Sequence, residues 1–401
     1  MKKIFLFSLL ILIALYSCED SYPPIIPLEP IVKGSVDTVF MKRAEQTFDK
    51  IFQHYWSNKV ELMFGSYPNS LGTPSEPNSP QHDVHAYLWG FGGVFSAFNA
   101  ILQYTSNEDF RRTYESRLKK SLDQYMNTNK TPAGYGCFVF DYDARLYDDA
   151  LWIGIDLADL YQYTNDEYYI ENAKIVWNFV MSGKDSNLGG GIYWQESPRD
   201  SKNTCVNAPA IVFAMKLYQL TKEDIYLNTA EELYQWTKQT LQDPADYLYW
   251  DNIGIDGDIG TAKFSYNSGQ MLQAGLLLYH ATKNEQYLSD AKDVAAACYQ
   301  NFFTDFTSSY SGEQFKIIKD GSLWFNAIMV RGFVELNQLE ENGVYMTAIR
   351  KSLDHAWRYA REEANGLFNA NLSGNKTEED ANKDILYQGA IAELFARVAV
   401  R

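Results

Sequence analysis

Cysteine and positive charge are both scarce in this chain of 401 residues. It has four cysteines, and the three that follow Cys18 are far apart: Cys137, Cys205 and Cys298. Their spacing fits neither a disulfide framework nor a metal site, so we expect each to be a buried apolar residue. The 35 Lys and Arg residues against 51 Asp and Glu residues give a formal net charge of −16. Because phosphate binding needs a basic stripe, this balance excludes nucleic acid as a partner.

Motifs for cofactor and nucleophile chemistry are also missing. The sequence has no glycine-rich phosphate loop and no Ser or Cys nucleophile motif. His82 and His85 lie close together, but no nearby carboxylate completes a convincing metal triad. We therefore expect neither a cofactor nor a resident metal.

The N-terminal segment is a targeting sequence rather than part of a fold. An apolar run over residues 4–16 follows two lysines and is too short to span a membrane permanently. It ends in LYSC, which resembles a bacterial lipoprotein box and implies a signal peptide over residues 1–17 with lipid attached to Cys18. An ordinary secretory signal is the alternative. The acidic, proline-rich residues 18–34 are typical of a tether, so we expect a lipid-anchored protein of a Gram-negative outer membrane, facing the periplasm or the outside.

An internal repeat organises the rest of the chain. The segments LYQYTNDEYYIENA, LYQLTKEDIYLNTA and LYHATKNEQYLSDA share a Leu-Tyr-x-x-Thr start, a polar turn and a closing Tyr-Leu/Ile-x-x-Ala. With two fainter copies, the turns fall near residues 105, 164, 221, 282 and 340, about 60 residues apart. Apolar residues at helical spacing flank each turn, which indicates five antiparallel helical hairpins.

Two further helices, near residues 37–55 and 384–398, bring the expected number to twelve. Twelve helices in six pairs predict an all-α fold, an (α/α)6 toroid forming a single domain over residues 35–401. An open solenoid is the alternative. In a toroid the short turns lie on one face, and the long connections rich in Gly, Pro and aromatic residues lie on the other. We expect the functional cleft on that second face.

Two adjacent carboxylates, Asp148 and Asp149 in RLYDDALW, lie where a long connection enters an apolar helix. Such carboxylates resist ionising together, so one keeps its proton more readily than the other. Hydrolysis of a glycosidic bond needs this division between an acid and a nucleophile or base. Their β-carbons would lie about 5–6 Å apart, which favours the retaining geometry. An acidic pair at a helix start is also common because the helix dipole favours it.

Residues near the expected inner-helix starts and in the long connections are candidate sugar-binding groups. Aromatic residues make up 15% of the chain, and flat amphipathic rings suit sugar faces. The candidates are Trp89, Tyr147, Trp152, Tyr193, Trp194, Asn207, Tyr249, Trp250, Asp251, Tyr266, Asn267, Trp324 and Gln388. The tryptophans at helix starts could instead belong to the core, and the amides could cap helices.

The order of these motifs resembles glycoside hydrolase family 76, the bacterial α-1,6-mannanases. RLYDDALW is followed by GGGIYW, CVNAPAIVFAMKLYQLT, FSYNSGQMLQAGLLLYHAT, LWFNAIMVRGFVEL and ILYQGAIAELFARV, so the resemblance covers about Phe40 to Val398. It implies an (α/α)6 catalytic domain that cuts α-1,6-linked mannan internally with retention of configuration. The adjacent aspartates are catalytic in that family, which implies Asp148 as the nucleophile and Asp149 as the general acid/base. In FSYNSG, two serines replace the family's usual Thr and Gln.

Two other interpretations stay open. A glycan-binding envelope lipoprotein without turnover would keep an aromatic cleft but would not need both aspartates. Another enzyme on the same toroid, an unsaturated glucuronyl hydrolase or a sugar epimerase, would want a basic pocket or paired histidines. The long connections are poor in Lys and Arg, and His82, His85, His280 and His355 do not pair by helix phase. We expect a monomeric domain whose partner is α-1,6-linked mannan or manno-oligosaccharides.

Overall fold

The computed structural model of the protein describes residues 35–68, 84–139, 144–341 and 343–400. The expected signal peptide, Cys18 and the tether over residues 18–34 lie outside the described residues. Within these described ranges, no helix combines the length and the apolar character that crossing a membrane requires.

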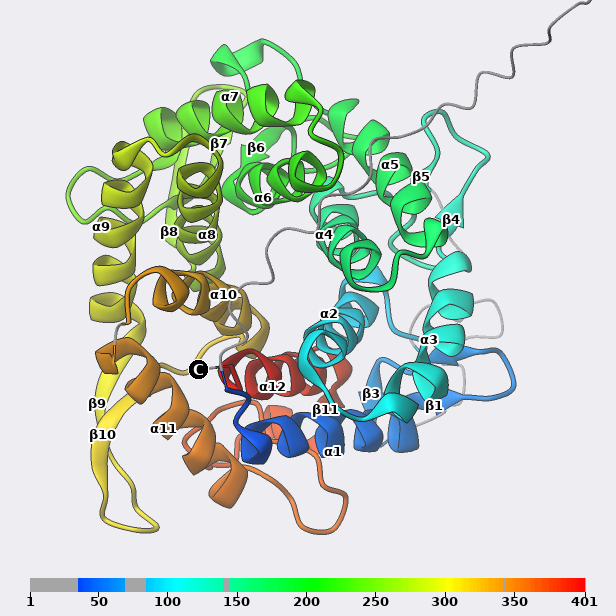
Figure 1. Cartoon of the computed structure of the whole chain (residues 1–401), viewed down its shortest axis with the longest axis vertical. Coiled ribbons are helices and arrows are strands. Elements are labelled where there is room, and N and C mark those ends of the chain that lie inside the picture. The colour runs from blue at the N-terminus through cyan, green and yellow to red at the C-terminus, as the bar shows by residue number, and fades with distance from the viewer. Residues whose placement is uncertain (1–34, 69–83, 140–143, 342, 401) are drawn as a thin grey trace, which may run out of the picture. The chain divides into compact units, whose positions relative to one another are not determined.

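Twelve α-helices in the described chain form an inner and an outer ring (Figure 1). The inner helices are α2 (Leu88–Tyr104), α4 (Tyr147–Thr164), α6 (Thr204–Thr221), α8 (Ser265–Thr282), α10 (Leu323–Leu339) and α12 (Ile385–Val398). The outer helices are α1 (Thr38–Tyr55), α3 (Glu108–Asp123), α5 (Glu167–Met181), α7 (Asp224–Leu241), α9 (Glu285–Phe302) and α11 (Gly343–Tyr359).

The two rings differ in how apolar residues are distributed along each helix. Inner helix α6 is buried without a break from Thr204 to Met215, so neighbours cover it on every side. Outer helix α9 buries a narrow stripe that includes Tyr287, Ala291, Val294 and Cys298. That spacing is one face of an amphipathic helix, with solvent on the other face. The sequence pattern of each helix therefore decides its ring.

The ring of inner helices is closed. Each inner helix packs on the next, and α12 packs on α2 to complete the circle. The two ends of the described chain also meet, because Val36 pairs with Val400 and the Asp37 amide donates to the Ala399 carbonyl at 2.7 Å. The predicted (α/α)6 toroid is therefore confirmed, and the open solenoid is excluded.

The repeated Leu-Tyr-x-x-Thr motif is the turn between an inner and an outer helix. In the first copy the Thr164 hydroxyl donates to the Leu160 carbonyl at 2.6 Å and accepts from the Asp166 amide at 3.3 Å. Asn165 adopts the left-handed conformation (φ 52°) that ends α4, and the Asp166 carboxylate caps the start of α5. The same geometry ends α6 and α8, so the predicted turns near residues 164, 221 and 282 are confirmed.

Short antiparallel strands lie in the long connections, and helical periodicity did not predict them. They are β1 (Trp56–Ser57), β2 (Leu62–Met63), β3 (Ser66–Tyr67), β4 (Met126–Asn127), β5 (Gly134–Tyr135), β6 (Ser201–Asn203), β7 (Trp250–Gly254), β8 (Ile259–Lys263), β9 (Phe303–Thr307), β10 (Gln314–Ile318) and β11 (Lys383–Asp384). The three-stranded sheet β6–β7–β8 joins two of the connections, with Asn203 paired to Asn252. None of these strands exceeds five residues, which is too short to give a clear alternating pattern.

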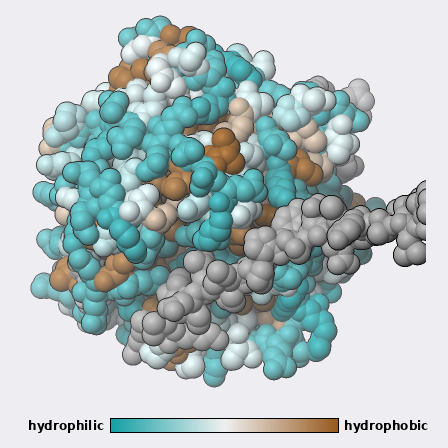
Figure 2. Space-filling model, turned by 45° about the horizontal axis from the view of Figure 1, so that its top comes forward, coloured by the Kyte–Doolittle hydropathy of each residue, from teal (hydrophilic) through white to brown (hydrophobic). Residues whose placement is uncertain are grey.

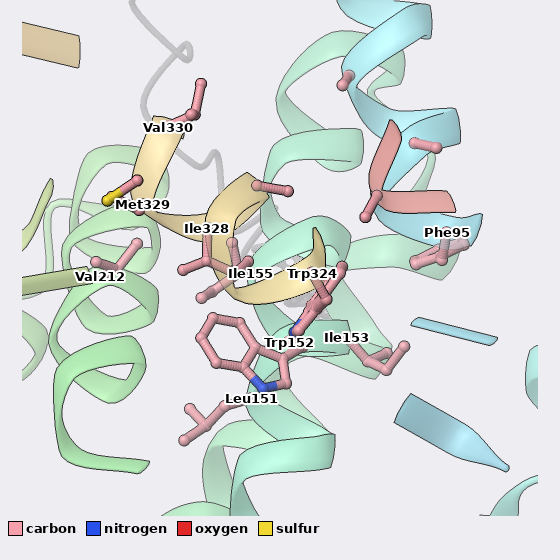
Figure 3. Packing of buried hydrophobic residues seen from close by; sticks show 14 of the residues in the cluster. Phe95, Leu151, Trp152, Ile153, Ile155, Val212, Trp324, Ile328, Met329 and Val330 are labelled. Carbon is pink, nitrogen blue, oxygen red and sulfur yellow. The ribbon is translucent and has the colours of Figure 1, made fainter. Parts of the chain in front are cut away.

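The apolar core lies between the helices, and large rings fill its centre. Trp152 of α4 and Trp324 of α10 meet edge to face, with ring centroids 5.9 Å apart (Figure 3). Aliphatic side chains of α4 and α10, Ile155 and Ile328 among them, pack nearby (Figure 3). The face of the molecule in Figure 2 is mainly hydrophilic, with hydrophobic residues in small separate patches.

Candidate active site

A cavity of about 790 Å³ lies where the inner helices begin, on the face of the long connections. Its wall includes residues from the first turns of α2, α4, α6, α8 and α10. The lining residues are Trp89, Leu146, Asp148, Asp149, Trp152, Trp194, Asp200, Ser201, Asn203, Cys205, Asp251, Asn252, Phe264, Tyr266 and Phe325. Aromatic rings and amides thus accompany the carboxylates, and among the described residues no Lys, Arg or His lines the cavity.

Asp148 lies in the first turn of α4, half-buried in the cavity wall. Its Oδ1 accepts the Asp149 amide N–H at 2.9 Å, and its Oδ2 accepts the Trp194 indole N–H at 2.9 Å. The Cys205 thiol is a third donor, 3.5 Å from Oδ2. Burial raises the pKa of Asp148 to about 6, while these donors stabilise its charged form and oppose the rise.

Asp149 is more enclosed, with only 7% of its surface exposed. Burial raises its pKa well above the ordinary value, and the negative charge of Asp148 raises it further. A hydrogen bond from the Cys137 thiol opposes this shift. The burial of Asp149 and the neighbouring negative charge favour its protonated form, while the donors around Asp148 favour the ionised form, which is the division between acid and base that two neighbouring carboxylates need.

Aromatic rings form one wall of the cavity. Tyr266 and Phe325 stack with ring centroids 3.9 Å apart and planes within 3°. Phe264 and Trp89 lie against Phe325, at 5.6 and 6.1 Å between centroids. Half-exposed rings of this kind offer flat apolar faces to a sugar.

Polar groups face this wall from the β6–β7 side. Asp251 and Asn252 come from β7, and Asp200, Ser201 and Asn203 come from β6 and the residue before it. Asn252 Nδ2 donates to Asp251 Oδ2 at 2.9 Å, and burial raises the pKa of Asp251. These groups can exchange hydrogen bonds with sugar hydroxyls.

Two buried cations hold the connection that carries Trp194. The Lys202 amine donates to Asp185 at 2.7 Å and to two backbone carbonyls, at 2.8 and 2.6 Å. The Arg145 guanidinium pairs with Glu196, with Nε 2.9 Å from Oε2. The indole of Trp194 is thereby fixed beside Asp148 before any ligand binds.

The structure brings part of the predicted site together. The predicted residues that line the cavity are Trp89, Asp148, Asp149, Trp152, Trp194, Asp251 and Tyr266. The predicted residues that do not line it are Tyr147, Tyr193, Asn207, Tyr249, Trp250, Asn267, Trp324 and Gln388. Within the second group, Trp250 lines a smaller hollow beside α7.

The aromatic members of this second group pack into the protein. The Tyr147 ring lies against Phe179, with centroids 4.8 Å apart, and the Tyr193 hydroxyl accepts from Asn187 at 2.8 Å. Tyr249 is buried, with 1% of its surface exposed, and Trp324 is fully buried. The sequence placed these rings near helix starts or in the long connections, but it did not tell which side each would face.

The polar members brace the connections instead. Asn207, the fourth residue of α6, exchanges hydrogen bonds with both backbone groups of Ile192, at 2.8 and 3.0 Å. Gln388, the fourth residue of α12, does the same with Phe368, at 2.8 and 3.0 Å. Asn267 is fully buried near Asp251. Asn207 and Gln388 thus each fix a backbone group next to the cavity.

Several lining residues were not predicted as site residues. They are Leu146, Asp200, Ser201, Asn203, Cys205, Asn252, Phe264 and Phe325. Phe264 and Phe325 are close neighbours of predicted residues, in FSYN and LWFN, and the period of the inner helices could have identified them. Cys205 is buried as expected but also borders the cavity.

A helical toroid with an unequal carboxylate pair in an aromatic-walled cavity has the architecture of a glycoside hydrolase. The model of Glycosyl hydrolase family 76 matches residues 40–399, so the chain belongs to this family and is a glycoside hydrolase.

Solved structures agree with this assignment. The chain is 32% identical to a family 76 mannosidase of Bacteroides thetaiotaomicron, with a TM-score of 0.83, covering 90% of this chain and 98% of that one. It is 35% identical to a family 76 glycoside hydrolase from a bovine strain of the same species, with a TM-score of 0.82, covering 92% of this chain and 78% of that one.

A curated fungal relative is similar over a shorter stretch. The chain is 31% identical to a mannan endo-1,6-alpha-mannosidase of Candida glabrata over 234 residues, 55% of this chain and 49% of the relative. The matched region thus spans about half the length of that relative.

Proposed function

We propose that the protein is an endo-acting α-1,6-mannanase that cleaves mannan backbones with retention of anomeric configuration. Asp148 is the nucleophile and Asp149 the general acid/base. The observation that carries this proposal is the contrast between the surroundings of the two aspartates in one cavity: Asp148 accepts hydrogen bonds from the Asp149 amide, the Trp194 indole and the Cys205 thiol, while Asp149 is almost fully buried. The mannosidase activities named for the bacterial and fungal relatives support the substrate.

The proposed reaction has two steps. In the first, ionised Asp148 attacks the anomeric carbon while Asp149 gives its proton to the departing glycosidic oxygen. The sugar is then held on Asp148 as an ester, and Asp149 is a carboxylate. In the second step Asp149 takes a proton from water, the water oxygen attacks the anomeric carbon, and Asp148 leaves as a carboxylate. Asp149 ends protonated, ready for the next turnover.

The cavity favours a neutral glycan over an acidic one. Its lining, as far as the structure describes the chain, contains four carboxylates, Asp148, Asp149, Asp200 and Asp251, and no basic side chain. An anionic sugar would meet repulsion without a compensating cation. This argues against the alternative of an unsaturated glucuronyl hydrolase.

For the cellular setting, we infer a monomer held in the cell envelope by lipid on Cys18. The lipid attachment is inferred from the sequence of residues 1–34 alone.

Product analysis on linear α-1,6-mannan tests the proposed function, with wild type beside Asp148→Asn and Asp149→Asn. We expect wild type to release short oligosaccharides, and each variant to lose activity by several orders of magnitude. Asp305→Asn is the matched control, because the Asp305 side chain is 91% exposed on the outer strand β9. NMR of the first product should show retained α configuration.

Two results would change the assignment. A wild type that binds mannan without releasing products would support the glycan-binding alternative. Release of single mannose units from the start would contradict endo action.

A further inference from the structure

Two of the three cysteines in the described chain touch the carboxylate pair, one on each aspartate. Cys205, in the first turn of α6, places its sulfur 3.5 Å from Asp148 Oδ2. Cys137, in the connection before α4, hydrogen-bonds through its thiol to Asp149. Both cysteines are free and buried, so neither belongs to a disulfide. Two thiols distributed in this way are unexpected from packing alone.

The Cys205 thiol is part of a short chain of hydrogen bonds. Tyr266, at the start of α8, is hydrogen-bonded through its hydroxyl to the Cys205 sulfur. The Cys205 thiol in turn donates to Asp148. Because S–H is a weaker donor than O–H, this contact supports the charged form of Asp148 without greatly reducing its basicity. A carboxylate that must attack carbon benefits from that balance.

Cys137 has a different neighbourhood. Its backbone is fixed on both sides, since its amide donates to Ala144 and its carbonyl accepts from Leu88, at 2.9 and 2.8 Å. The thiol is therefore placed beside Asp149 by the connection and by the start of α2. Burial keeps the pKa of both thiols above their usual value, so neither is a reactive thiolate.

Other titratable groups surround the pair without replacing the thiols. Asp251 of β7 and Asp200 before β6 line the same cavity as Asp148, and Tyr266 of α8 lies near Asp148. Tyr87, the residue before α2, faces Asp149 and also Asp384. All of these groups are acidic or neutral. Within the described residues, the side-chain donors to the two aspartates are thus Trp194 and the two thiols.

We propose that Cys205 and Cys137 are positioning residues, each of which hydrogen-bonds one aspartate: the Cys205 thiol supports the ionised form of the nucleophile, and the Cys137 thiol eases the release of the proton from the acid. The proposal rests on the proposed function for its kinetic test. It assigns the two thiols to separate tasks, Cys205 to the ionised nucleophile and Cys137 to the protonated acid.

The pH dependence of kcat/KM separates the two tasks, because it reports the ionisation of the free enzyme. The acidic limb follows the group that must be ionised, Asp148, and the alkaline limb follows the group that must be protonated, Asp149. Removing a donor from a carboxylate raises its pKa. Cys205→Ala should therefore move the acidic limb to higher pH, and Cys137→Ala should move the alkaline limb to higher pH. Each shift should be about half a unit, since S–H is a weak donor.

The chain offers a matched control and a conservative variant. Cys298→Ala removes the third buried thiol, in α9, and should leave both limbs in place. Cys205→Ser keeps a donor and should hold the acidic limb below that of Cys205→Ala. Circular dichroism and thermal unfolding identify any variant that fails to fold. For such a variant, the serine substitution at the same position carries the test.

The outcomes are distinct. Limbs that stay in place in both folded Ala variants would show that the thiols only fill space, and limbs that move together would refute separate tasks. An inactive wild type would refute the proposed function instead. In that case the role of the two thiols is decided by NMR titration of the Asp148 and Asp149 carboxyl carbons in wild type and variants. Each Ala substitution should raise the pKa of one carboxyl.

Discussion

Trp194→Phe is the substitution that most directly probes the state of Asp148. The indole N–H donates to Asp148 Oδ2 at 2.9 Å, and phenylalanine keeps an apolar ring while removing this donor. The Asp149 amide and the Cys205 thiol still donate to the carboxylate. The change therefore removes one hydrogen bond to the charged form and leaves the other donors in place.

The size of the effect follows from that one bond. A hydrogen bond to a charged group contributes about 1.5–3 kcal/mol, and 1.36 kcal/mol corresponds to about one pKa unit. We take the lower end, because Asp148 borders the cavity and water can replace part of the lost donor. The pKa of Asp148 should rise from about 6 by about one unit.

The assay is kcat/KM against pH on a defined linear α-1,6-manno-oligosaccharide. Because Asp148 must be ionised to attack, its raised pKa moves the acidic limb to higher pH. At pH 6 the ionised fraction falls from about one half to about one tenth, a loss of about fivefold. Trp56→Phe is the control, since its indole N–H bonds to Asn58, away from the cavity. A loss that is equal at every pH would refute this reasoning and leave Trp194 a purely steric role.

Two further predictions concern the inner ring. Gly269→Ala places a Cβ 2.2 Å from the Met329 Cα, where α8 crosses α10. It should lower the free energy of unfolding in urea by about 3 kcal/mol, and an unchanged midpoint would contradict so close a crossing. Glu393→Ala leaves Arg331 buried without its partner, whose carboxylate lies 2.7 Å from Nε, and should cost about 3–5 kcal/mol at pH 7. Although burial alone raises the pKa of Glu393, Arg331 and Arg397 hold it below the ordinary 4.5. The stabilisation that ionised Glu393 provides is therefore present above pH 4.5 and is lost as the pH falls through its lowered pKa. The unfolding curves of wild type and Glu393→Ala should therefore converge in acid.

The sequence predicted the fold well because the fold is local and repeated. Helix periodicity, Thr-terminated turns and a constant repeat length fix the number, length and order of the helices. The aspartate pair and Trp194 lie in the cavity as expected, since each follows directly from its place at the start of a helix or in a long connection. Periodicity could not predict the direction in which each side chain points from its helix.

That direction explains the residues that lie elsewhere. Asn207 and Gln388 occupy the fourth position of their helices, as do Ser268 and Asn326, and each of the four bonds to the backbone of the preceding connection. The hydroxyl oxygen of Ser268, although its side chain is short, accepts a hydrogen bond from the Tyr249 amide at 3.0 Å. These polar residues recur at one helical position because each connection needs a hydrogen bond to its backbone at that place. A comparison of the repeats for polar residues, and not only for apolar ones, would have separated residues that hydrogen-bond the connections from residues that line the cavity.

The meeting of the two ends of the toroid fixes the side of the domain on which the described chain begins. The inner helices begin at the cavity, and α12 ends on the opposite side, where Val400 pairs with Val36. The described chain therefore enters the toroid from its back. A surface attached at that end would support the domain from behind and leave the mouth directed outward, where a long polymer can approach. The length of the attachment would set how far the enzyme reaches, without obstructing the opening through which it works.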